Sequence, residues 1–112
     1  IRAAHEQERA VAIHCVSEVE LVFALAALED AGTMNGDRIE HAAVALPEYI
    51  ARMAELGLVG CVQPHFVHER GDRYLLDVEV SSHPHLYRLA SLSAAGIPLA
   101  DGSDAPFANH NP

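Results

Sequence analysis

Four short strand-like segments, three of them apolar and separated by stretches with helical spacing, constrain the fold more than any other feature of this sequence. They lie at residues 10–15, 38–42, 58–63 and 97–101, and the second is the most polar. Near-continuous apolar strands are typical of parallel sheets, which helices cover. The alternation of strand and helix therefore predicts an α/β fold built from parallel βαβ units.

The segments between the expected strands carry signals for helices. A capping box at residues 17–20 opens one helix, and Pro47 suits the first turn of another. Residues 84–95 also have helical spacing. The polar stretch 64–83 is expected to be irregular, apart from a short helix near residues 74–78.

The length of the chain limits how many such units it can hold. The spacing from His14 to His41 is 27 residues (41 − 14), about one βα unit. A complete (β/α)₈ barrel needs ~250 residues, or ~31 per unit. The 112 residues therefore correspond to about four units, the size of half a TIM barrel. A small four-stranded open α/β domain is the alternative.

Both ends of the chain suggest a piece of a longer protein. The first residue is Ile1 rather than Met, and the sequence stops at Pro112 in a loop-like stretch. We therefore treat residues 1–112 as a single fragment. The first and last strands of a half barrel are open edges, which favour pairing with another copy, so a homo-oligomer is expected for the isolated chain.

Composition excludes several classes of function. The net charge of −9, from 7 arginines and 16 acidic residues, repels phosphate backbones, so no nucleic-acid partner is expected. No apolar run approaches the ~18 residues that span a bilayer, so no membrane partner is expected. Two cysteines, Cys15 and Cys61, do not make a disulfide framework, and a cytoplasmic location is expected.

Three side chains of metal-binding type end expected strands. His14 and His41 close the first and second strands, and Asp104 follows the fourth. The carboxyl ends of parallel strands meet at one edge of a sheet, where α/β folds place their sites. Imidazole and carboxylate are ligands of Zn²⁺ and similar ions. Taken singly, each such residue is more often a hydrogen-bonded or solvated loop residue than a ligand.

Four motifs in this order give the sequence a family resemblance: Val11-Ala12-Ile13-His14, Arg38-Ile39-Glu40-His41-Ala42, Val62-Gln63-Pro64 and Gly102-Ser103-Asp104-Ala105-Pro106. The set resembles the metal-dependent amidohydrolase superfamily. It is most similar to the branch with N-substituted formamide deformylases and D-aminoacylase-like enzymes, from about Ala10 to the end. The resemblance implies that the chain is the second half of a TIM barrel, units five to eight.

The resemblance also implies roles for residues. His14 and His41 would be metal ligands, and Asp104 would be both a metal neighbour and the proton-transfer base. The expected cofactor is a divalent metal, zinc first, as one or two ions. A metal-activated water would then cleave the C–N bond of an amide-like, non-peptide small molecule. The family's H-x-H pair and its carboxylated lysine or acidic substitute are not in this sequence, so the remaining ligands are expected outside it and the isolated chain is expected to be inactive.

Further polar residues near the expected strand ends are candidates for substrate contact: Gln63, His65, His68 and His110. His83-Pro84-His85 is interpreted as a loop and helix start, and Glu40 as a structural residue paired with an arginine. The rival hypothesis is a non-catalytic α/β module for binding or assembly, in which the histidines and Asp104 are ordinary loop residues.

Overall fold

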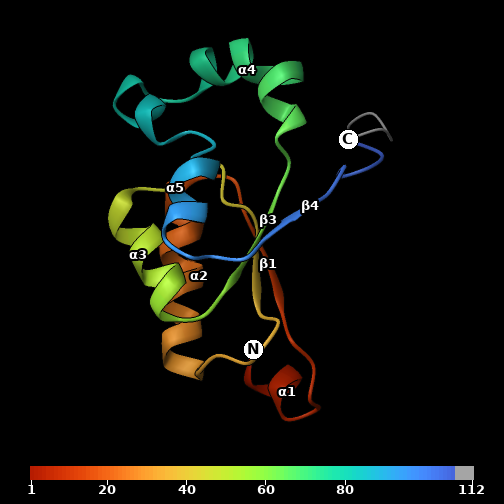
Figure 1. Cartoon of the computed structure of the whole chain (residues 1–112). Helices are drawn as coiled ribbons and strands as arrows, with labels where there is room; N and C mark the ends of the chain where they lie inside the picture. The colour runs from red at the N-terminus through yellow and green to blue at the C-terminus, as the bar shows by residue number, and fades with distance from the viewer. Residues whose placement is uncertain (108–112) are drawn as a thin grey trace.

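A computed structural model describes residues 1–107 and contains a four-stranded parallel sheet with helices (Figure 1). The strands lie side by side in chain order, and each pairs in parallel with the next: β1 (Ala12–Cys15), β2 (Arg38–His41), β3 (Val59–Val62) and β4 (Leu99–Asp101). Each strand falls inside the segment that the sequence predicted. The predicted α/β class is confirmed, and the open sheet agrees with part of a barrel.

Three helices lie together on one side of the sheet (Figure 1): α2 (Glu18–Ala31), α3 (Pro47–Glu55) and α5 (Leu89–Ala94). A short helix, α1 (Arg2–His5), lies near the amino-terminal ends of the strands. One-sided packing is the expected result of repeated right-handed crossovers between parallel strands. No helix within residues 1–107 is long and apolar enough to cross a bilayer.

The predicted capping box fixes the start of α2. The Ser17 hydroxyl accepts a hydrogen bond from the amide of Glu20, and the Glu20 carboxylate accepts the amides of Val16 and Ser17 at 2.8 and 2.7 Å. These bonds satisfy amides that a helix start leaves without partners. The turn between β1 and α2 is therefore short and well determined.

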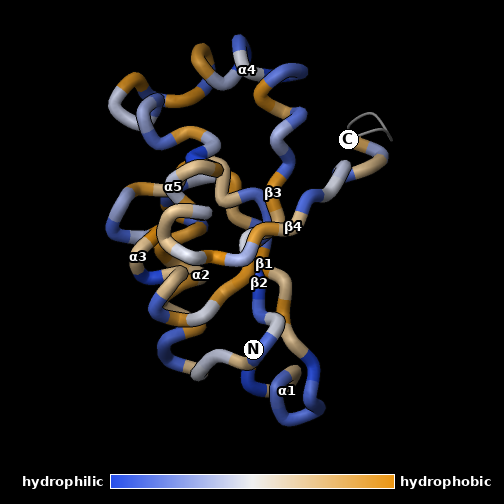
Figure 2. Tube along the Cα trace, viewed as in Figure 1, coloured by the Kyte–Doolittle hydropathy of each residue, from blue (hydrophilic) through white to orange (hydrophobic). Residues whose placement is uncertain are grey.

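Alternate strand residues face the helices and form the core. Cys15, Ile39 and Val62 are 1, 0 and 4% exposed and belong to one apolar cluster with residues of α2, α3 and α5. Figure 2 shows hydrophobic colour along the strands and the helices beside them. Burial of each large apolar side chain stabilises the fold by about 1.5–3 kcal/mol.

The opposite face of the sheet carries polar side chains. Arg38 donates to the Glu40 carboxylate at 2.6 Å, which is the arginine pairing expected for Glu40. Cys61 lies beside Glu40 in the register and is half-buried, whereas Cys15 is buried against the helices, and both thiols are free. The two cysteines thus lie on opposite faces and form no disulfide.

The prediction for residues 64–83 is wrong. They contain α4 (His65–Asp77), a 13-residue helix, and the start of a 3₁₀ helix, η1 (Val80–His85). Only Phe66 of α4 is buried, so the usual apolar stripe of a packed helix is missing from the sequence. Helix α5 also begins later than predicted, at Leu89, because Pro84 lies in η1 and the left-handed backbone of Tyr87 (φ 45°) interrupts the helical path.

Candidate active site

A cavity of about 360 Å³ lies at the carboxyl ends of the strands. It is lined by the three residues that the sequence placed at strand ends, His14, His41 and Asp104. The other lining residues are Val16, Phe66, Arg70, Tyr74, Tyr87 and Phe107. The side chains predicted to converge therefore border the same space.

The two histidines meet because the backbone turns at the end of β2. The register pairs Cys15 with His41, so simple alternation would direct His41 toward the helices with Cys15. His41 instead has φ 71° and is followed by Ala42 at φ 47°. Its ring stands edge-on to the His14 ring, with 4.6 Å between the centroids. The left-handed turn thus brings together two side chains from opposite faces of the sheet.

Backbone strain is concentrated around this cavity. Within residues 1–107, five non-glycine residues have positive φ, and three of them line the cavity: His41, Tyr87 and Asp104. Ala42, a fourth, adjoins His41. A left-handed conformation costs a non-glycine residue about 1–2 kcal/mol, and such residues cluster at functional sites when the surrounding structure holds them there. The pattern favours a functional role for the cavity.

The environment of His41 keeps its imidazole neutral. Its pKa lies below the ordinary value because burial penalises the charged ring and because His14 is close by. Asp104, Gln63 and Glu40 oppose this shift without reversing it. Neutral imidazole is the form that binds a metal ion.

The chemistry of the donor set fits a divalent metal in part. Two adjacent imidazoles and a carboxylate on the same cavity are ligands that zinc and related ions accept. Within the part of the chain that the structure describes, however, no three His, Cys, Asp or Glu side chains lie close enough together to hold one ion. The described residues therefore supply an incomplete set of ligands.

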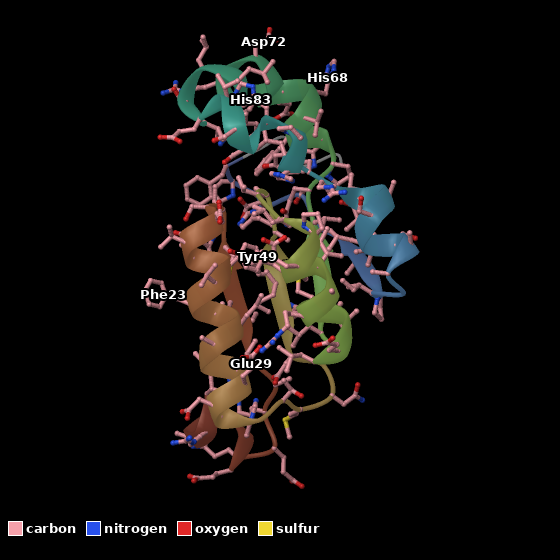
Figure 3. All side chains as sticks on the ribbon, turned by 90° about the vertical axis from the view of Figure 1, so that its left-hand side faces the viewer. Phe23, Glu29, Tyr49, His68, Asp72 and His83 are labelled. Atoms are coloured by element: carbon pink, nitrogen blue, oxygen red, sulfur yellow. The ribbon has the colours of Figure 1, made fainter. Side chains whose placement is uncertain are left out.

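Of the four substrate-contact candidates from the sequence, the three that the structure describes do not line the cavity, although Gln63 lies close to His41. Gln63 is buried, and its amide donates to the Cys61 carbonyl at 3.4 Å. His65 packs edge-on against Phe66, and His68 points outward from α4 (Figure 3). None of these three lines the cavity, and His110 lies outside the described residues. Their role in substrate binding stays a prediction.

The His83-Pro84-His85 segment forms local structure, as the sequence suggested. It lies within η1, and the His83 ring is 2.9 Å from the Val78 carbonyl. This contact holds the turn between α4 and η1, and neither His83 nor His85 lines the cavity. The segment therefore has no part in the cavity.

Sequence reasoning missed the residues that α4 contributes to the cavity. Phe66, Arg70 and Tyr74 are spaced by four residues, so they lie along one face of the helix. This spacing is compatible with a helix, but Arg70 in its middle means that it does not read as an apolar stripe. Tyr87 and Phe107 come from separate segments, and no local pattern links them to the others.

Comparisons with known proteins agree with this geometry. A model of the amidohydrolase family matches residues 1–112. A Bacillus subtilis (strain 168) protein named as an amidohydrolase, YtcJ, is 32% identical over 109 residues, which are 96% of this chain and 21% of that protein. Crystal structures of uncharacterized metal-dependent hydrolases from Pyrococcus furiosus and Pyrococcus horikoshii OT3 are each 28% identical, with a TM-score of 0.84 over 96% of this chain and 22% of theirs. The chain spans about a fifth of the length of these relatives.

Proposed function

The chain belongs to the amidohydrolase family, and on this premise we propose that it forms part of the catalytic barrel of a metal-dependent hydrolase. The proposed reaction is hydrolysis of a C–N bond in an amide-like small molecule, as the branch that the motifs resemble would carry out. The family match over residues 1–112 favours this over a non-catalytic binding or assembly module.

One observation carries the proposal. The rings of His14 and His41 stand 4.6 Å apart at the carboxyl ends of adjacent strands, and Asp104 lines the same cavity. Adjacent strands of a parallel sheet bring such side chains to the edge where α/β enzymes place their chemistry. His41 and Asp104 also adopt left-handed backbones, and such residues cluster at functional sites.

The residues of this chain would have two roles, metal binding and proton transfer. His14 and His41 would hold a divalent metal, with zinc first among the candidates, through neutral imidazole nitrogens. When bound, such an ion supplies Lewis acidity that lowers the pKa of water and polarises a carbonyl group. The carboxylate of Asp104 would take a proton from the attacking water and pass it to the leaving nitrogen. The burial of His41 favours the uncharged ring that this role requires.

The rest of the parent protein would supply what residues 1–107 lack. The ligand set described above is incomplete, so further metal ligands would come from outside this chain, and the isolated chain would be inactive. The same missing part would cover the free edges of β1 and β4. Without it, these edges would pair with another copy, and light scattering after size exclusion should show dimers or larger species of the 112-residue chain. A stable monomer would contradict this view.

The metal content of the full-length parent protein tests the proposal. Elemental analysis should find one or two divalent ions per chain, and the His14→Ala/His41→Ala double variant should lose or deplete them. His68→Ala is the matched control, because His68 is exposed and lies outside the cavity. Metal-free parent protein, purified without chelator and supplied with zinc, would reduce His14, His41 and Asp104 to structural residues.

A further inference from the structure

Aromatic side chains are concentrated in the cavity. The chain has three Phe, three Tyr and no Trp, and four of these six line the cavity: Phe66, Tyr74, Tyr87 and Phe107. The apolar cluster between sheet and helices contains none of the four. The fold is therefore stabilised without them, and their convergence calls for another reason.

Three of the four rings take part in two aromatic pairs along α4. Phe66 stacks on His41, with 6.3 Å between the ring centroids and 11° between the planes. The rings of Tyr74 and Tyr87 lie 5.3 Å apart, and the Tyr87 hydroxyl donates to the Tyr74 hydroxyl at 2.8 Å. The aromatic surface thus begins at His41 and continues along α4 to Tyr87.

Internal contacts hold these rings in place. The Arg70 guanidinium lies 4.8 Å above the Phe66 ring and donates to the carbonyl of Phe107, so it ties α4 to the segment after β4. The amide of Tyr87 donates to the Ala43 carbonyl at 2.9 Å, which fixes its strained backbone beside the end of β2. Arg70 is therefore occupied in holding α4, and Phe66 is 4% exposed behind His41 and Arg70, so it supports the aromatic surface from behind. The rings of Tyr74, Tyr87 and Phe107 are what the cavity offers to a ligand.

We infer that Tyr74, Tyr87 and Phe107, supported by Phe66, form a specificity subsite for a flat aromatic group of the substrate. The inference rests on the proposed function, which places the scissile amide beside His14, His41 and Asp104. Aromatic rings prefer offset-stacked or edge-on contact with other flat rings, and a puckered ring of similar size cannot reproduce that contact. Ligand pockets typically have volumes of ~300–1,000 Å³, so the cavity is of a size that holds such a group.

Two matched compounds test the subsite on the full-length parent protein. N-acetyl-2-phenylethylamine and N-acetyl-2-cyclohexylethylamine share the amide and the linker but differ in ring flatness. Titration calorimetry should give a dissociation constant roughly three- to tenfold lower for the phenyl compound, the range expected of aromatic pairs beyond their buried area. The kcat/KM values, where turnover occurs, should show the same preference. The cyclohexyl ring is the more apolar, so simple hydrophobic burial predicts the opposite order.

Substitutions of single rings test whether the aromatic side chains cause the preference for the phenyl compound. Tyr74→Leu should bring the ratio of the two dissociation constants close to one, whereas Tyr74→Phe, which keeps the ring, should preserve it. Phe107→Leu should lower the ratio, and Phe23→Leu should not. Phe23 and Phe107 are both 72% exposed, but Phe23 points outward from α2 (Figure 3).

The outcomes distinguish this inference from the hydrolase proposal. Equal affinities for the two compounds, a preference for the cyclohexyl ring, or no binding of either would overturn the subsite and leave the metal measurement untouched. An aromatic preference in a parent protein that holds no metal would overturn the hydrolase proposal alone.

Discussion

The two ends of the sheet use the same residue types, histidine and aspartate, in opposite ways. At the amino-terminal ends, Asp37 is fully buried and its carboxylate lies 3.0 Å from the His5 ring. The amides of Val11 and Met34 also donate to this carboxylate, both at 2.8 Å. At the carboxyl-terminal ends, by contrast, histidines and an aspartate border an open cavity, and two of these three residues have left-handed backbones.

This contrast between the two ends distinguishes a structural ion pair from a candidate site. The oxygens of Asp37 are taken by three donors of the chain itself, so no ligand can reach them. This carboxylate ties α1 and the starts of two strands together. The cavity end instead carries strain and open space, which cost stability and are typical of functional sites. Four predictions test this contrast.

The largest expected effect is on catalysis. Asp104→Asn in the full-length parent protein should lower kcat by about 10²–10⁴-fold, the usual contribution of a general acid or base. Asp37→Asn should leave kcat nearly unchanged, because Asp37 lies at the other end of the sheet. Steady-state rates with an amide substrate check both, with circular dichroism as the control for folding. Similar losses in the two variants would remove the distinction between the ends.

For the free energy of unfolding, we expect substitution of Asp37 to have a larger effect than substitution of Asp104. Asp37→Ala leaves the part-buried amides of Val11 and Met34 without their acceptor, and each such loss costs about 1–3 kcal/mol. Denaturant titration of the parent protein should therefore show a loss of about 3 kcal/mol, whereas Asp104→Ala should change stability by less than ~1 kcal/mol. A larger loss for Asp104→Ala would identify Asp104 as the structural residue.

The amino-terminal end should also be sensitive to acid. Burial opposes ionisation of Asp37, but the hydrogen bonds from Val11, Met34 and His5 outweigh it, so its pKa lies below the ordinary 3.8. A carboxylate with a lowered pKa adds stability above the pKa of the unfolded chain, and this contribution disappears as pH falls through the folded value. Melting temperatures between pH 6 and pH 2 should fall less steeply for Asp37→Asn than for the parent protein. Asp72→Asn, an exposed position on α4, should follow the parent curve.

The smallest expected effect concerns strain. Ala42 and Ala45 are both buried beyond the end of β2, but only Ala42 has a positive φ, 47°. Glycine adopts that conformation without penalty, so Ala42→Gly should be more stable than Ala45→Gly by about 1 kcal/mol. Denaturant titration of the two variants measures the difference. Equal stabilities would mean that the backbone at the cavity is not strained.

The parts of the fold that could be predicted are those whose signals are local. Near-continuous apolar runs marked three of the four strands, and the more polar second strand fitted the alternation of strands and helices. The capping box at Ser17 and Glu20 marked the start of α2. Helix α4 lacked such a signal because it buries a single residue, Phe66, and has a glycine, Gly71, in its middle. Its position follows from tertiary contacts with Tyr87 and Phe107. These residues are too far away in the sequence for a local pattern to reveal the contacts.

In the candidate site, too, the residues with a local sequence signal could be predicted and the others could not. His14, His41 and Asp104 could be located because each closes or follows an apolar strand, where parallel sheets gather functional groups. His65 and His68 were predicted near the site because they follow the third strand, at the same end of the sheet. Helical geometry separates them from it, because a step of one residue along α4 turns a side chain by about 100° away from Phe66. Only every fourth position of this segment faces the cavity.

The arrangement has a consequence for how such a protein can change over evolutionary time. The residues proposed for the chemistry follow strands, whereas three of the four rings that border them belong to one excursion, residues 64–88, inserted between β3 and α5. This excursion adds a single large side chain, Phe66, to the buried residues of the described chain. Its sequence can therefore drift, or be exchanged for another, with little effect on folding, so that selectivity and reaction chemistry can be inherited separately.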